Sequence, residues 1–186
     1  MARIGMTDAE RADPRVQEAF AFVKGNWAEL PALYDALGAA PGMLKAWIDF
    51  AWTLRLEAKT DRALRELIIM RGAQVAGAVY EWAHHLDMAL EAGVSQAQLD
   101  ALKTWRGSDL FSAGERAALA MAEEVTEGPG ASAETLAALK AEFSQEQVAE
   151  LVLTASFYVC VARVLTSLGV EVAPRFEAAA RSFAPC

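Results

Sequence analysis

The chain has 186 residues, among them two histidines and two cysteines, and a formal net charge of −8 at pH 7. This length is enough for one domain with a sizeable core, and the acidic balance, without a Lys/Arg cluster, argues against a nucleic-acid partner. Hydrophobic residues make up 54% of the chain and the mean hydropathy is +0.18, yet no apolar run approaches the roughly 18 residues of a membrane span. The composition therefore predicts a helical protein, outside the membrane, that buries surface against copies of itself.

The N-terminus and the cysteines add no targeting or metal signal. Residues 1–10 contain no apolar signal segment, so a cytoplasmic location is expected. Cys160 lies in an apolar run and is predicted to be a small buried hydrophobe, whereas Cys186 is predicted to be a free thiol on the C-terminal tail. Neither forms a Cys-x-x-Cys pair, and two histidines without further ligands at zinc spacing predict no metal site.

Prolines, glycines and one aspartate mark helix ends in the first part of the chain. Pro31 and Pro41 suit the first turns of helices, and Gly38 can end the short helix between them. Asp61 can cap a helix over residues 61–75, where apolar residues recur at intervals of three and four. The sequence therefore predicts helices here.

The same signals continue to the end of the chain. Gly77 offers a break before a helix over residues 80–92, and Gly93 offers its C-terminal stop. A turn is predicted at residues 128–130, and the last long helix over 148 to about 168. No alternating strand pattern occurs, so the fold class is all-α. Three capping boxes open helices in this part: Ser95 with Gln98, Ser112 with Glu115, and Ser144 with Gln147.

Both histidines fall within the helix predicted over residues 80–92. Glu81 and His85 are four residues apart, so they share one helix face. With Glu66 on the preceding helix, these side chains are the minimum for general acid–base chemistry, and burial beside Trp82 is predicted to raise the pKa of a carboxylic acid. The alternative is a structural role, which is the commoner fate of a histidine pair on an amphipathic helix. The concentration of both histidines beside two carboxylates favours function.

A short internal sequence similarity indicates two related helical halves. Residues 65–69 are mirrored by residues 149–153, and in each a glutamate precedes aliphatic residues. Coincidence is the alternative, because such patterns are common at helix starts. Glu150 is then interpreted as a structural charge near a helix N-terminus. The chain is interpreted as a single domain over 1–186, with an N-terminal half to about 103 and a C-terminal half from about 110.

Three segments, residues 65–71, 80–85 and 89–95, resemble the carboxymuconolactone decarboxylase family, whose superfamily also contains alkylhydroperoxidase D. Residues 111–120 and 157–163 resemble the C-terminal part of its members, and the resemblance covers about Pro31 to Leu168 in all. It implies an all-helical, alkylhydroperoxidase D-like bundle. It also implies a homo-oligomer, either a trimer or a trimer-based hexamer, that needs no cofactor.

The resemblance assigns motif positions. The peroxidase branch has a glutamate, a Cys-x-x-Cys pair and a histidine. Here Glu66 and His85 keep the outer positions, while Ala78 and Glu81 stand where the cysteines would be. A thiol peroxidase is therefore not expected, since it needs a thiolate and a resolving thiol. The decarboxylase branch typically has glutamate at the second of these positions, as this chain does. Val159 departs from the asparagine that often follows Phe-Tyr in similar proteins.

In the interpretation that follows, His85 donates a proton, Glu81 supports the imidazolium, and Glu66 relays or orients the proton. An anionic substrate would need a cation. The substrate-binding candidates are Tyr80, Trp82, His84, Arg71 and Arg163. The alternative roles are packing for Tyr80, an outward position facing an interface for His84, and structural ion pairs for the two arginines.

The expected function is general acid–base decarboxylation or lyase chemistry on a small carboxylated or lactone-type substrate. One rival is an alkylhydroperoxidase-like redox protein, which the missing thiol pair argues against. A second is a non-catalytic, ligand-binding helical oligomer, which the buried ionisable groups argue against because burying such groups without a role is costly.

Overall fold

The computed structural model describes residues 3–27 and 29–185, and this part of the chain contains helices and no strand, so the all-α fold is confirmed. Two short 3₁₀ segments, η1 and η2, accompany the α-helices. The bounds in chain order are α1 (Asp8–Arg11), α2 (Pro14–Asn26), α3 (Ala32–Leu37), α4 (Pro41–Leu56), α5 (Arg62–Ala76), α6 (Val79–Glu91), α7 (Gln96–Ala101), η1 (Leu102–Gly107), α8 (Ala113–Glu127), α9 (Ala133–Glu142), α10 (Gln145–Leu168), η2 (Pro174–Phe176) and α11 (Glu177–Arg181).

The helix ends follow the predicted capping signals. Asp61 accepts hydrogen bonds from the backbone at the start of α5, and Gly77 ends that helix in the left-handed region at φ 67°. All three predicted capping boxes form, at the starts of α7, α8 and α10. Because each cap satisfies backbone N–H groups that the helix leaves unpaired, these residues set where the helices begin.

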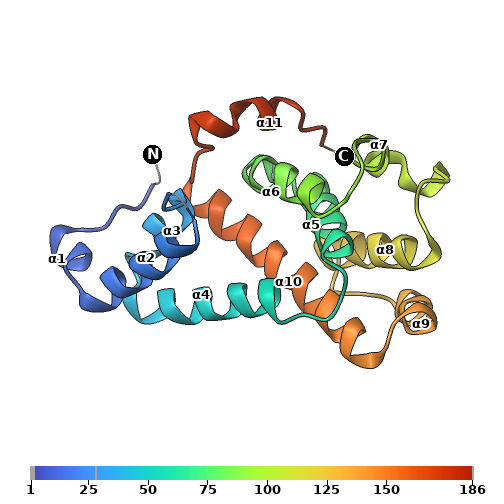
Figure 1. Cartoon of the computed structure of the whole chain (residues 1–186), viewed down its shortest axis with the longest axis horizontal. Coiled ribbons are helices and arrows are strands. Elements are labelled where there is room, and N and C mark those ends of the chain that lie inside the picture. Colours follow the sequence, from blue (N-terminus) through green and yellow to red (C-terminus); the bar gives the residue numbers. More distant parts are fainter. Residues whose placement is uncertain (1–2, 28, 186) are drawn as a thin grey trace.

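The centre of the molecule is built around α5. This helix packs against α6, α8 and α10, while α2 packs on α4 and α11 packs on α6. In Figure 1 the N-terminal helices lie above α4 at one end of the molecule. Helices α8 and α9 lie at the other end, and α11 passes over α6. The arrangement brings one face of α6 towards α4 and α10, and the candidate site lies there.

Helix α10 alone, within the described residues, is long and apolar enough to cross a membrane by length and composition. It packs against α4, α5, α8 and α9, which is equally typical of a core helix. Its exposed face carries Cys160, so the prediction of a buried cysteine is wrong. Cys186 lies outside the described residues. Self-association, a cytoplasmic location and the division into two halves stay predictions.

Candidate active site

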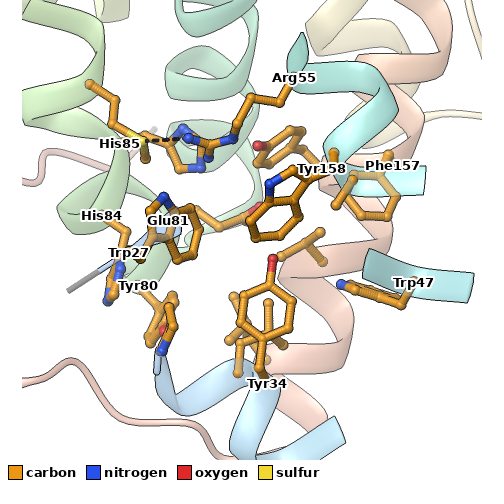
Figure 2. Close-up of a pocket in the computed structure, with 17 residues that line it drawn as sticks. Trp27, Tyr34, Trp47, Arg55, Tyr80, Glu81, His84, His85, Phe157 and Tyr158 are labelled. Carbon is orange, nitrogen blue, oxygen red and sulfur yellow. Dashed lines mark hydrogen bonds between the residues drawn. The ribbon is translucent and has the colours of Figure 1, made fainter. Parts of the chain in front are cut away.

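A cavity lies where α3, α4, α6 and α10 meet. Its volume is about 70 Å³, which is room for roughly five waters. Figure 2 shows the labelled rings of Trp27, Tyr34, Trp47, Phe157 and Tyr158 around this space, together with the polar side chains of α6. Such a site fits a small, flat molecule better than a long chain.

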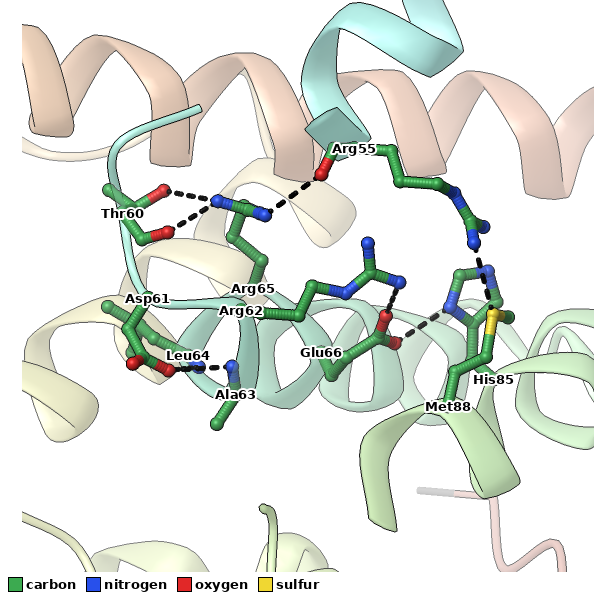
Figure 3. A network of polar contacts seen from close by, with 10 residues as sticks. All are labelled: Arg55, Thr60, Asp61, Arg62, Ala63, Leu64, Arg65, Glu66, His85 and Met88. Carbon is green, nitrogen blue, oxygen red and sulfur yellow. Dashed lines mark hydrogen bonds and ion pairs between the residues drawn. The ribbon is translucent and has the colours of Figure 1, made fainter. Parts of the chain in front are cut away.

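The first polar element of the cavity is a histidine held by a buried carboxylate. Nδ1 of His85 lies 2.8 Å from Oε2 of Glu66, whose residue is 0% exposed. Arg62, one turn earlier on α5, is ion-paired to the other oxygen (Figure 3). Burial acts to raise the pKa of Glu66, but His85 and Arg62 outweigh it, so the pKa lies below its ordinary value. Glu66 is thus ionised, Nδ1 of His85 donates to it, and Nε2 has no hydrogen-bond partner among the described residues.

Glu81 is the second polar element, and its surroundings have the opposite effect. It lines the cavity, is 3% exposed, and its Oε1 has no hydrogen-bond partner among the described residues. Burial raises the pKa of Glu81 well above its ordinary value, so burial favours the neutral carboxylic acid over the carboxylate. The prediction that Glu81 supports the imidazole is wrong, because Glu66 makes that contact. Burial raises this pKa in the predicted direction, but Trp82, the neighbour that the prediction named, packs on the opposite side of α6.

Two neighbours on α6, Tyr80 and His84, also line the cavity. Their rings stack with centroids 4.0 Å apart, and His84 meets Phe176 of η2 at 3.9 Å. Burial, followed by the charges of His85 and Arg175, lowers the pKa of His84 to about 3. Burial raises the pKa of Tyr80 to about 12. Both rings are therefore neutral walls of the site, and His84 does not face outward as its alternative role required.

The structure does not bring the other three substrate-binding candidates to this cavity. Trp82 packs on the opposite side of α6, where its Nε1 donates to the Ser182 hydroxyl at 3.0 Å. Arg71 is ion-paired with Glu123, its Nη2 at 2.6 Å from Oε1. Arg163 lines separate surface hollows on α10, as does Val159, so the departure noted at Val159 lies outside the cavity.

Sequence reasoning missed three polar residues of the cavity, Tyr34, Tyr158 and Arg55. Tyr158 meets His85 edge-on with ring centroids 4.9 Å apart, although it stood in a segment that carried the family resemblance. Arg55, in the last turn of α4, projects its guanidinium to 3.4 Å from Sδ of Met88. The one signal for Arg55 was a basic residue near the end of an apolar helix.

No group of three or more His, Cys, Asp or Glu side chains placed to hold a metal ion occurs within residues 3–27 and 29–185. The polar groups of the cavity are instead one ionised carboxylate behind a histidine, one neutral carboxylic acid and one guanidinium. This set is suited to moving protons and to holding an anion.

A model of the carboxymuconolactone decarboxylase family matches residues 41–124, a segment that contains Arg55, Glu66, Glu81 and His85. The chain is similar to this family over that segment, which is less than half of its length. The match ends before α9 and α10, so it covers the α4 and α6 walls of the cavity. Comparison of the sequence with curated proteins gives no significant match.

Solved structures share the alkylhydroperoxidase D-like fold at low identity. The debrominase Bmp8, in complex with 2,3,4-tribromopyrrole, is 20% identical, with 97% of this chain and 96% of that chain covered and a TM-score of 0.81. The alkylhydroperoxidase AhpD core from Ralstonia eutropha, an uncharacterised peroxidase-related protein, is 16% identical, with 98% of both chains covered and a TM-score of 0.80. A putative antioxidant defence protein AhpD from Agrobacterium tumefaciens is 21% identical, with 74% of this chain and 94% of that chain covered and a TM-score of 0.67. These likenesses establish the fold.

The cavity lining that the structure describes contains no cysteine. Of the two positions where the peroxidase pattern would have sulfur, Ala78 lies in the core below α6 and Glu81 lines the cavity. Cys160 is exposed on α10, outside the cavity. The groups able to react in the cavity are therefore acids and bases.

Proposed function

We propose that the protein is an enzyme that performs acid–base decarboxylation or a related lyase reaction on a small, flat, carboxylated or lactone-type substrate. One observation carries the proposal: His85 has one buried carboxyl group bonded to it, Glu66, and shares its cavity with a second, Glu81, and their surroundings shift the two pKa values in opposite directions. Such opposed pairs are how one site holds an acid and a base at the same pH. A buried carboxylate with a purely structural role usually has hydrogen-bond partners for both oxygens. Oε1 of Glu81 has no hydrogen-bond partner among the described residues.

The roles follow from the protonation states. Glu66, ionised, fixes the ring of His85 so that Nε2 can accept or return a proton. Glu81, neutral, can donate to an oxygen on which negative charge develops. This assignment exchanges the two glutamates relative to the sequence interpretation, which gave Glu81 the orienting role.

A decarboxylation uses these groups in a balanced way. The bond to the departing carboxylate breaks, CO₂ leaves, and the electron pair moves through the conjugated system to a carbonyl oxygen. Glu81 donates to that oxygen, and His85 then delivers a proton, taken from solvent, to carbon. Loss of CO₂ and gain of one proton at carbon complete the reaction.

The size of the cavity restricts the substrate class. Room for roughly five waters suits a ring with a few substituents, and the aromatic walls favour a flat, conjugated molecule. The debrominase Bmp8, of the same fold, is in complex with the small ring 2,3,4-tribromopyrrole. This likeness supports a small ring here, while the reaction rests on the residues of this chain.

The test is a panel of small unsaturated lactone acids incubated with the protein in D₂O. We expect release of CO₂ with one deuterium incorporated at carbon, and a loss of turnover of about 10² to 10⁴ in His85→Gln, the scale for general acid–base groups. Circular dichroism should show that the variant keeps its helices. A panel without CO₂ release and without deuterium exchange in the wild-type protein would refute the enzyme assignment and leave the non-catalytic binding protein as the better account.

A further inference from the structure

Arg55 brings a positive charge to a cavity whose other walls are mostly aromatic. Its guanidinium carbon lies 4.9 Å from the centre of the Trp27 ring, and Nη1 lies 3.4 Å from Sδ of Met88. A thioether is a weak acceptor, and a guanidinium has five N–H donors. Most of the hydrogen-bonding capacity of Arg55 is therefore unused.

The other arginines near the core differ in this respect. Arg62 is ion-paired with Glu66, and Arg71 with Glu123. Arg55 has no ion pair with any carboxylate among the described residues, although it lines a cavity that also contains Glu81. A guanidinium that lacks a carboxylate partner inside a cavity is a ready site for an anionic ligand.

The local charge balance points the same way. Arg55 and Arg62 are two positive charges, Glu66 is one negative charge, and burial favours the neutral form of Glu81. With Glu81 protonated, these four groups carry one surplus positive charge, against −8 for the whole chain. This surplus is compensated when one monoanionic group enters.

The backbone at Arg55 is held by a hydrogen bond from the side chain of Arg65 (Figure 3). The buried side chain of Arg65 donates to the backbone carbonyls of Arg55, at 3.2 Å, and of Ala58, at 3.3 Å. Glu150 of α10 accepts from the backbone N–H of Lys59 at 2.9 Å, which ties the same loop to α10. The end of α4 is thus clamped between two helices, and Arg55 projects from a rigid position.

We infer that Arg55 binds a carboxylate of the substrate, and that this carboxylate is one that the substrate keeps throughout the reaction. The ligand class is a small, flat, unsaturated acid whose carboxylate meets the guanidinium while its ring lies against the aromatic walls, next to Glu81 and His85. This inference rests on the proposed function, because it names the substrate class of the same site.

The retained carboxylate follows from transition-state reasoning. An ion pair with Arg55 stabilises a carboxylate, but CO₂ is neutral, so the pair would be lost as the carboxylate departs. Binding that weakens on the way to the transition state slows a reaction. Arg55 therefore suits a carboxylate that anchors the substrate, and a decarboxylation substrate would carry a second carboxylate that leaves.

The experiment compares acids with their neutral amides as ligands of the full-length protein. The probes are furan-2-carboxylate and benzoate, paired with furan-2-carboxamide and benzamide, and binding is followed by calorimetry. Wild type should bind the acids at least tenfold more tightly than the amides. Arg55→Gln should lose roughly 10- to 100-fold in affinity for the acids, the scale of a charged hydrogen bond, with little change for the amides. Arg163→Gln, with the same charge change outside the cavity, should match wild type.

Two outcomes would overturn the inference: acids bound no more tightly than amides by wild type, or an acid preference that persists in Arg55→Gln. Failure of the proposed function looks different. If the acids bind through Arg55 but the wild-type protein releases no CO₂ and exchanges no deuterium, the anchor stands and the enzyme assignment fails. If turnover depends on His85 but acid binding does not depend on Arg55, the reverse holds.

Discussion

Two buried glutamates in this protein have nearly the same exposure and opposite surroundings. Glu123 on α8 is 7% exposed, and Glu81 on α6 is 3% exposed. Glu123 accepts from Nε of Arg71 and Nε1 of Trp105, both at 2.7 Å, and pairs with Arg106 at 2.5 Å. Oε1 of Glu81 has no partner in the described part of the chain.

The comparison shows that burial alone does not decide the pKa of a carboxyl group or its capacity for a ligand, because its hydrogen-bond partners decide both. Burial acts to raise the pKa of Glu123, but its hydrogen bonds from Trp105, Arg106 and Arg71 outweigh that effect and lower it. For Glu81 burial acts without such opposition and the pKa rises. A saturated carboxylate holds helices together, whereas an unsaturated one beside a cavity still has capacity for a ligand.

The largest effect in this comparison is expected from Glu123→Gln. The substitution removes a charge on which two guanidinium groups and an indole converge, so it should lower the free energy of unfolding by about 3 kcal/mol. For a domain of this size that corresponds to a fall in Tm of roughly 6 to 12 °C, measurable by thermal circular dichroism. Turnover per folded molecule should stay at the wild-type level. Loss of turnover without loss of stability would mean that Glu123 belongs to the reacting groups.

Glu81→Gln should act in the opposite direction. The folded protein keeps the Glu81 proton to a higher pH than the unfolded chain, whose pKa is near the ordinary 4.5. Between these two pKa values the folded state binds more protons, so Glu81 makes wild-type stability fall as pH rises, by at most about 1.4 kcal/mol per pH unit. The neutral amide lacks this term, so the variant should gain in Tm over wild type from pH 4.5 towards pH 7. A Tm difference that is constant over that range would show that Glu81 titrates normally.

The sequence predicted some of the helix ends and missed others. Capping residues and glycines located ends of α5, α7, α8 and α10 because they act on neighbouring backbone groups. Helices α2 and α9 went unpredicted, although Asp13 and Ser132 cap them. Buried apolar positions are few in α9, so its periodicity is weak.

The sequence predicted the part of the site that a single helix, α6, provides. Four-residue spacing placed Glu81 and His85 at the same cavity. The same spacing argues against Trp82 as a residue of this cavity, because adjacent residues on a helix, such as Glu81 and Trp82, point about 100° apart. Which carboxylate would meet His85 depended on how α5 packs on α6, and Arg55 comes from α4, so neither followed from local pattern. Tertiary packing decided both.

The smallest effect is expected from removing sulfur altogether, with Cys160→Ser and Cys186→Ser combined. A buried Cys160, as predicted from the sequence, would lose packing on substitution, but the side chain is exposed, so the change in Tm should be close to zero. Turnover should also persist, because the proposed reaction uses Glu66, Glu81 and His85 and no thiol. These are the two cysteines of the chain, so the double variant cannot reduce a peroxide through a disulfide. A peroxide-reducing activity present in wild type and absent from this variant would restore the redox rival. A retained lactone-acid turnover would leave the buried carboxyl pair as the reacting groups.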